Sequence, residues 1–126
     1  MLEKKNKIAV ICNDAGGAEI LSSYIRQQGI KPLFCIDGPA VSIFERKFEA
    51  LKIDSLEQVI EQADCFLCGT SWQSELEWNA IELARTKGIK SIAYLDHWVN
   101  YRERFIRNGV EHLPDEIWVG DSYAQI

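Results

Sequence analysis

The segment 64–105 constrains the fold most, because it contains two short apolar runs separated by an amphipathic stretch of helical length. Residues 65–68 (CFLC) and 91–95 (SIAYL) have the length and composition of buried strands, and residues 74–87 between them place apolar side chains at helical spacing. Gly88 is typical of a helix C-terminus. A strand–helix–strand unit of this kind is nearly always a right-handed crossover between parallel strands. The segment therefore predicts a parallel sheet covered by helices.

The alternation of strand and helix continues along the rest of the chain. Further apolar runs predict strands at residues 7–13, 32–37 and 116–120, with a very short one at 51–53. Amphipathic spacing predicts helices over residues 18–28, 40–50 and 56–62. This pattern indicates the α/β class, as a three-layer α/β/α Rossmann-like domain with a mainly parallel sheet of five or six strands. The strand order 3-2-1-4-5-6 follows if the short third strand forms, and a flavodoxin-like order is the alternative.

Residues 1–126 are expected to form one domain, and the given sequence ends with residues 122–126 (SYAQI), where another helix would be expected to begin. The net charge of −5 gives no general attraction to nucleic acid. No apolar run approaches the roughly 20 residues of a membrane-spanning helix, and the run at residues 8–12 is too short for a signal-peptide core. We therefore expect a cytoplasmic protein with no integral membrane segment and no nucleic-acid partner, while a homodimer is left open.

The four cysteines do not form a convincing metal or redox motif. Cys65 and Cys68 have CxxC spacing, but they lie within a predicted strand, where residues three apart point to opposite faces. Neither His97 nor His112 belongs to a pair with zinc-like spacing. We expect no metal site and interpret all four cysteines as small buried thiols in a reducing compartment.

The loop after the first strand, NDAGGAE at residues 13–19, is the first candidate site. It contains neither GxxxxGK[ST] nor GxGxxG, so no nucleotide cofactor is expected. Gly16 and Gly17 at a helix N-terminus would expose backbone N–H groups that suit an anion or a sugar hydroxyl, with Asn13 beside them. Asp14 and Glu19 would repel a phosphate, which favours hydroxyl recognition. The structural alternative is that the glycines make the turn and Asp14 caps the helix.

The loop after residues 65–68 is the second candidate site, because it combines small residues with hydroxyls, an amide and an indole. Its ligand-binding candidates are Gly69, Thr70, Ser71, Trp72 and Gln73. An aromatic platform with hydrogen-bonding neighbours suits sugars and nucleobases. A structural alternative holds for the end of this loop, where Ser74 would cap the following helix and Glu77 would complete a capping box.

The loop after residues 91–95 is the richest in chemistry. Asp96 could orient His97 as a general base. Its ligand-binding candidates are Trp98, Asn100, Arg102 and Arg104, of which the arginines could meet a phosphate or carboxylate. The alternative is a solvated loop held by Arg–Glu pairs. In open parallel sheets ligands bind outside the carboxyl ends of the strands, so all three loops are expected along one edge.

Three features together resemble a known family. They are the Gly-rich first loop, the Ala63-Asp64 strand that ends in Gly69-Thr70-Ser71, and the run KGIKSIAYLDH at residues 87–97. This arrangement is similar to the N-terminal Rossmann-like half of GT-B glycosyltransferases and of the related UDP-N-acetylglucosamine 2-epimerases. The resemblance spans nearly the whole chain as a pattern.

The resemblance implies that the Gly-rich loops line an interdomain cleft and that this half handles the acceptor. Asp14, Glu19 or His97 would then be the general base, and a sugar or nucleotide-sugar the ligand. The nucleotide-sugar site of these families lies mostly in a C-terminal half, so a further domain or a partner chain would complete the cleft, and this chain is not expected to be active alone. The alternative is a small non-catalytic Rossmann- or flavodoxin-like module that binds a nucleotide or sugar phosphate.

Overall fold

Strand β1 (Ile8–Cys12) is an interior strand of the main sheet, and every one of its residues is buried because both faces of the sheet are covered. A computed structural model describes residues 7–49, 51–70, 75–95, 105–107, 109–119 and 122–124. The main sheet has the order β2-β1-β3-β4-β7-β8. Its other strands are β2 (Leu33–Ile36), β3 (Cys65–Cys68), β4 (Lys90–Leu95), β7 (Glu116–Val119) and β8 (Ser122–Ala124). The first five strands of this order are parallel, and β8 pairs antiparallel with β7.

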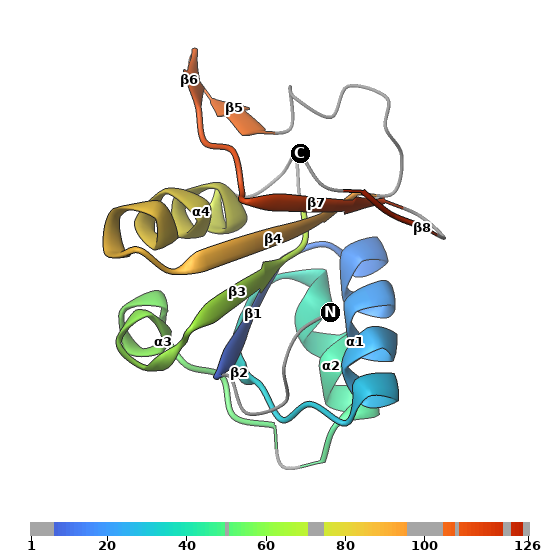
Figure 1. The fold of residues 1–126 in the computed structure, drawn as a ribbon. Coiled ribbons are helices and arrows are strands. Elements are labelled where there is room, and N and C mark those ends of the chain that lie inside the picture. Colours follow the sequence, from blue (N-terminus) through green and yellow to red (C-terminus); the bar gives the residue numbers. More distant parts are fainter. Residues whose placement is uncertain are drawn as a thin grey trace.

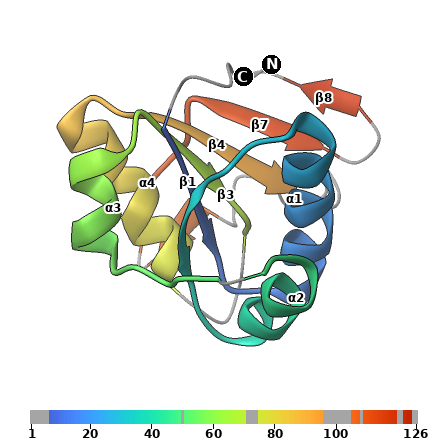
Figure 2. The same cartoon turned by 90° about the horizontal axis from the view of Figure 1, so that it is seen from below.

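Two layers of helices cover the sheet (Figures 1 and 2). The helices α1 (Ala15–Gln28) and α2 (Pro39–Lys47) pack on one face, where Val10 and Phe44 belong to the same buried cluster. The helices α3 (Leu56–Gln62) and α4 (Leu76–Lys87) pack on the other face, where Ile11 and Ile81 are buried together. Successive residues of β1 thus point into different cores, as the two-residue period of a strand requires. The three-layer Rossmann-like fold that the sequence predicts is confirmed.

The strand order agrees with the prediction except at the two edges of the sheet. At the β2 edge, the predicted strand at 51–53 is reduced to one bridge between Ile53 and Phe34. Ser55 then starts α3 with a capping box, in which it exchanges hydrogen bonds with Gln58, so the chain leaves the sheet after a single pairing.

At the other edge, the expectation of a helix starting at about residue 122 is wrong. Residues 122–124 form β8, which turns back on β7 with Val119 and Ser122 as register partners. The two residues between these partners are Gly and Asp in the sequence, a pair typical of tight hairpin turns. The hairpin signal therefore predominates over the expected helix.

A small antiparallel hairpin packs against α4. It consists of β5 (Ile106–Arg107) and β6 (Val110–Glu111). The Trp78 indole Nε1 donates a hydrogen bond of 2.8 Å to the Phe105 carbonyl, and the His112 ring stacks on Trp78 with centroids 3.7 Å apart. Aromatic contacts thus hold the hairpin to the helix that follows β3.

Candidate ligand site at the carboxyl ends of β1 and β3

Asp14 occupies the N-cap position of α1. Its Oδ2 accepts a hydrogen bond of 2.8 Å from the Gly17 backbone N–H, which confirms the predicted cap. The helix begins at Ala15, three residues earlier than expected, so Gly16 and Gly17 lie in its first turn rather than in a loop. A Cβ at Gly17 would lie 2.8 Å from Asp14 Oδ1, so glycine is needed there for the carboxylate to approach the helix. The start of α1 therefore presents a carboxylate.

Asn13 connects the end of β1 to three other elements. Its backbone N–H donates to Glu77 Oε2 of α4 at 3.0 Å, and its Nδ2 donates to Asp37 Oδ1 after β2 at 2.6 Å. Its carbonyl accepts from the Ala40 N–H of α2 at 2.9 Å. Gly38 has φ 57° and ψ −146°, a conformation open essentially to glycine, and a Cβ there would lie 2.5 Å from Asn13 Nδ2. The Asp37-Gly38 turn is thus built around the Asn13 side chain.

Gly69 at the end of β3 lies against the first loop. Its N–H donates to the Ile11 carbonyl at 2.9 Å, which extends the pairing of β3 with β1. A Cβ at Gly69 would lie 2.9 Å from Glu77 Oε2 and 3.0 Å from both Asp14 Oδ1 and Cys12 Sγ. Two of the three predicted loops therefore meet at this point. We call Cys12, Asn13, Asp14, Gly69 and Glu77 the edge network.

Cys12, Asp14 and Glu77 form a group, within the described ranges, whose ligand atoms are close enough to hold a metal ion, all within 4.8 Å of one another. Burial and the charges of Glu77 and Asp14 raise the pKa of the Cys12 thiol well above its usual value, so it is protonated at neutral pH. The thiol donates to the Asp14 carbonyl at 3.5 Å. A metal would require the thiolate. Because each carboxylate also accepts a backbone N–H, the group fits the role of holding the loop better than that of a metal site.

Thr70 lies inside the fold rather than on its surface. Its hydroxyl donates to the Tyr94 carbonyl at 3.0 Å, and the residue is only 8% exposed. This bond ties the carboxyl end of β3 to that of β4. Thr70 therefore supports the edge where the predicted third loop begins.

Glu19 does not belong to the edge network. Its Oε1 pairs with Lys47 Nζ of α2 at 2.7 Å. The hydrogen bond and charge of Lys47 lower the pKa of the Glu19 carboxyl. A carboxylate with a lowered pKa that already pairs with an ammonium is a weaker general base.

The other predicted site residues fall outside the described ranges. They are Ser71, Trp72, Gln73, Asp96, His97, Trp98, Asn100, Arg102 and Arg104. Ser74 also lies outside them, while α4 begins at Leu76 with Glu75 at its N-cap and no side-chain cap. The Glu77 carboxylate accepts a hydrogen bond from the Asn13 backbone N–H across the sheet edge.

Sequence reasoning missed four residues of this edge, namely Cys12, Asp37, Gly38 and Glu77. Asp37-Gly38 follows β2 as the candidate loops follow β1 and β3, and that position was a usable signal. Glu77 gave no such signal, because an acidic residue in the first turn of a helix has a sufficient local explanation.

Comparison with protein-family models, with curated proteins and with solved structures gives no match for this chain. In the part of the chain that the structure describes, none of the helices combines the length and apolar character needed to cross a membrane.

Proposed function

We propose that the carboxyl edge of β1 and β3 binds a hydroxyl-rich ligand, and that the domain is the acceptor side of a GT-B-like glycosyltransferase of polysaccharide or glycoconjugate synthesis. A second domain or partner chain would supply the nucleotide-sugar site. The sequence resemblance supports the family, and the edge network supports the ligand class.

The proposed ligand class rests on one observation, namely that the Gly17 N–H already donates a hydrogen bond to Asp14. A phosphate at a helix N-terminus accepts hydrogen bonds from such N–H groups, whereas here Asp14 Oδ2 already accepts this one at 2.8 Å. The carboxylates of Asp37 and Glu77 also accept hydrogen bonds from Asn13, so negative charge surrounds this corner. A sugar hydroxyl can donate to a carboxylate, while a phosphate would be repelled. Neutral polyhydroxy ligands are therefore favoured.

Asp14 is the general-base candidate that the edge network presents. A base must lie within hydrogen-bond reach of the hydroxyl that it deprotonates, and Asp14 lies at the end of β1, half-buried and oriented by the Gly17 N–H. Glu19 is the weaker candidate because of its pair with Lys47. His97, with Asp96 beside it, follows β4 directly and stays a candidate by its position in the sequence.

One observation favours the alternative of a small nucleotide-binding module. Asp37 is exposed at the carboxyl end of β2 and comes 20 residues after Gly17. Dinucleotide-binding Rossmann domains use an acidic residue at about this spacing to bind a ribose hydroxyl. The Asn13 amide holds Asp37 by one oxygen, Oδ1, at 2.6 Å.

Calorimetry on this chain separates the two functions. The probes are glucose, galactose and N-acetylglucosamine as neutral sugars, with UDP-N-acetylglucosamine, FMN and NAD⁺ as nucleotides. We expect weak saturable binding of at least one neutral sugar, lost in Asp14→Ala and kept in Glu61→Gln, a matched change on the exposed surface of α3. Tight binding of FMN or NAD⁺ to this chain alone would instead favour the module.

A further inference from the structure

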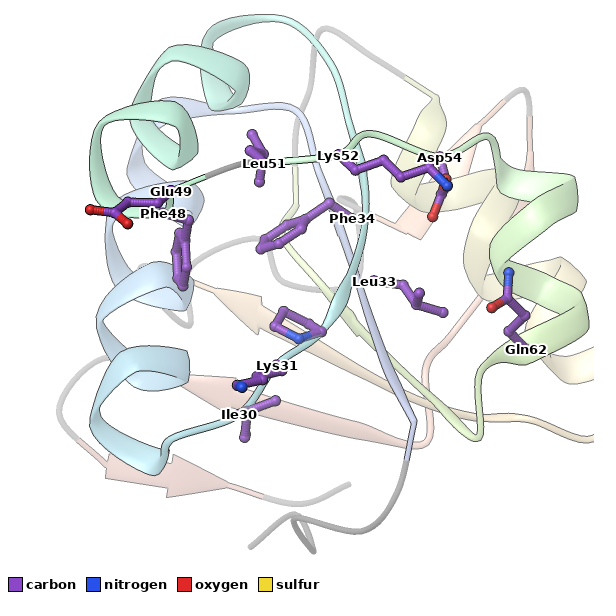
Figure 3. A pocket seen from close by; sticks show the side chains of 11 residues that line it. Ile30, Lys31, Leu33, Phe34, Phe48, Glu49, Leu51, Lys52, Asp54 and Gln62 are labelled. Atoms are coloured by element: carbon purple, nitrogen blue, oxygen red, sulfur yellow. The ribbon is translucent and has the colours of Figure 1, made fainter.

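A cavity of about 440 Å³ lies at the amino-terminal end of β2, away from the edge network (Figure 3). The segment entering β2, the segment between α2 and α3, and α3 itself contribute its walls. Apolar walls come from Phe34, Phe48 and Leu51, and polar ones from Lys52, Asp54 and Gln62. Small-molecule sites fall in the range of roughly 300–1,000 Å³, so the volume suits a compact ligand. We call this the β2 cavity.

The β2 cavity spans the edge of the sheet, because Leu33 and Phe34 of β2 point to opposite faces. Phe34 belongs to the core under α1 and α2, whereas Leu33 packs against the core under α3 and α4. Beyond β2 the described chain adds only the single bridge at Ile53. The cavity therefore replaces the third strand that the sequence predicts.

Aromatic contacts fix the apolar wall. The Phe34 ring lies 5.4 Å from both Phe44 and Phe48, at interplanar angles of 61° and 59°. Phe44 and Phe48 stack at 5.9 Å. Figure 3 shows the Phe34 and Phe48 rings near each other on one side of the cavity and Lys52 with Asp54 on the other. One side therefore offers a preformed apolar surface and the other a charged pair.

Asp54 provides the second, independent indication of a ligand. Its side chain is only 8% exposed, and its backbone N–H donates to the Phe34 carbonyl at 2.7 Å, which fixes its position. Ser55 and Gln58 cap α3 by themselves, so the helix does not use the Asp54 carboxylate. Among the described residues its only charged partner is Lys52, whose Nζ lies 3.7 Å from Asp54 Oδ1. The Lys52 side chain is 83% exposed. A mostly buried carboxylate normally has closer partners than this.

We propose that the β2 cavity binds a small amphipathic amine. The apolar body of the ligand rests on Phe34 and Phe48, and its ammonium donates charge-assisted hydrogen bonds to the Asp54 carboxylate in place of Lys52. Gln62 of α3 lines the same cavity and offers an amide to a further polar group of the ligand. This inference is independent of the proposed sugar site, since the two lie at opposite ends of β2.

Three probes of similar size but different charge test this proposal in a ¹H–¹⁵N NMR titration: benzylamine, benzyl alcohol and benzoate. We expect benzylamine to shift the Phe34 and Asp54 amides saturably. It should bind about tenfold more tightly than benzyl alcohol, as the loss of a charge-assisted hydrogen bond implies. Benzoate should bind most weakly. Tighter binding of benzoate, through Lys31 or Lys52, would overturn the proposal, as would no saturable shift with any probe.

Two substitutions with opposite expected effects sharpen the test. Asp54→Asn keeps the shape but removes the charge, and it should weaken benzylamine binding about tenfold. Lys52→Ala removes the competing ammonium, and it should tighten binding. Because Lys52 is highly exposed, this variant remains decisive even if Asp54→Asn fails to fold. Glu49→Gln, an exposed carboxylate of the same cavity, serves as the matched control and should change little. Weaker benzylamine binding in Lys52→Ala would contradict the proposal.

Discussion

The two ends of the sheet use buried carboxylates differently. At the carboxyl end, Glu77 is 2% exposed and accepts the Asn13 N–H at 3.0 Å, and Asp14 accepts the Gly17 N–H at 2.8 Å. At the amino end of β2, Asp54 is similarly buried, yet its charged partner in the described chain is the exposed Lys52 at 3.7 Å. Burial alone therefore does not identify a binding group. The difference is whether a backbone N–H already donates a hydrogen bond to the carboxylate.

The largest effect should come from adding a methyl group where the carboxyl end is most tightly packed. Gly38→Ala combines a glycine-only conformation with a contact of 2.5 Å to Asn13 Nδ2, and we expect a loss of about 2–4 kcal/mol in the free energy of unfolding. Gly88→Ala is the matched control, because its φ is 73° but nothing lies within 4 Å of the added Cβ. It should cost about 1 kcal/mol. Urea unfolding measures both, and equal losses would show that the contact with Asn13 is unimportant.

The next largest effect compares the two buried carboxylates directly. Glu77→Ala leaves the Asn13 N–H without this acceptor and should cost about 2–3 kcal/mol. Asp54→Ala removes a carboxylate that no backbone N–H of the described chain uses, so stability should change by no more than about 0.5 kcal/mol. Chemical denaturation of the two variants gives both values. A large loss for Asp54→Ala would mean that its carboxylate is structural.

The buried thiols of the sheet should make the free energy of unfolding decrease at alkaline pH. Burial raises the pKa of the Cys35 and Cys65 thiols from 9.0 to about 11. Below pH 9 both thiols are protonated in the folded and unfolded states, and their contribution is fully present. Between pH 9 and 11 the unfolded thiols ionise first, so stability is lost by about 2 kcal/mol per thiol.

Urea midpoints at pH 8 and pH 10.5 check this dependence. The double variant Cys35→Ala/Cys65→Ala should lose less stability over the same interval, because it lacks both groups. An unchanged pH dependence in that variant would assign the effect to other residues.

The smallest effect concerns the helix caps. Asp14→Ala removes the cap of α1, and Ser55→Ala removes that of α3; each should cost about 1 kcal/mol. Asp14→Asn keeps an oxygen that can accept the Gly17 N–H, so its cost should be smaller. Thermal unfolding by circular dichroism compares the three. A loss for Asp14→Ala well above that for Ser55→Ala would show that Asp14 stabilises more than its helix.

The sequence predicted those parts of the fold that local pattern determines. The helix at 56–62 and the strand at 65–68 have their expected bounds, since a capping Ser and a bounded apolar run define them. Of the predicted third strand at 51–53, only Ile53 pairs with β2, and Ser55 already caps α3 two residues later. The pairing of β8 with β7 was not predicted, although the Gly-Asp pair between them in the sequence is typical of tight hairpin turns.

The candidate site shows the same division. The Asp14 cap is a short-range bond across three residues and was predicted. The contact of Glu77 with Asn13 joins residues 64 positions apart, and it depends on the crossover that brings α4 beside β1. The close packing around Gly69 likewise arises only because the end of β1, the start of α1 and α4 meet at this residue. Contacts between residues far apart in the sequence therefore became visible only in the structure.

The most direct test of the proposed site is an NMR titration that follows the amides of Asn13, Gly17 and Gly69. Neutral sugars should move these three resonances saturably, and inorganic phosphate should leave them in place, because the Asp14 carboxylate already occupies the helix N-terminus. If phosphate shifts them saturably while glucose, galactose and N-acetylglucosamine do not, this edge is an anion site and the proposed recognition of sugar hydroxyls is wrong.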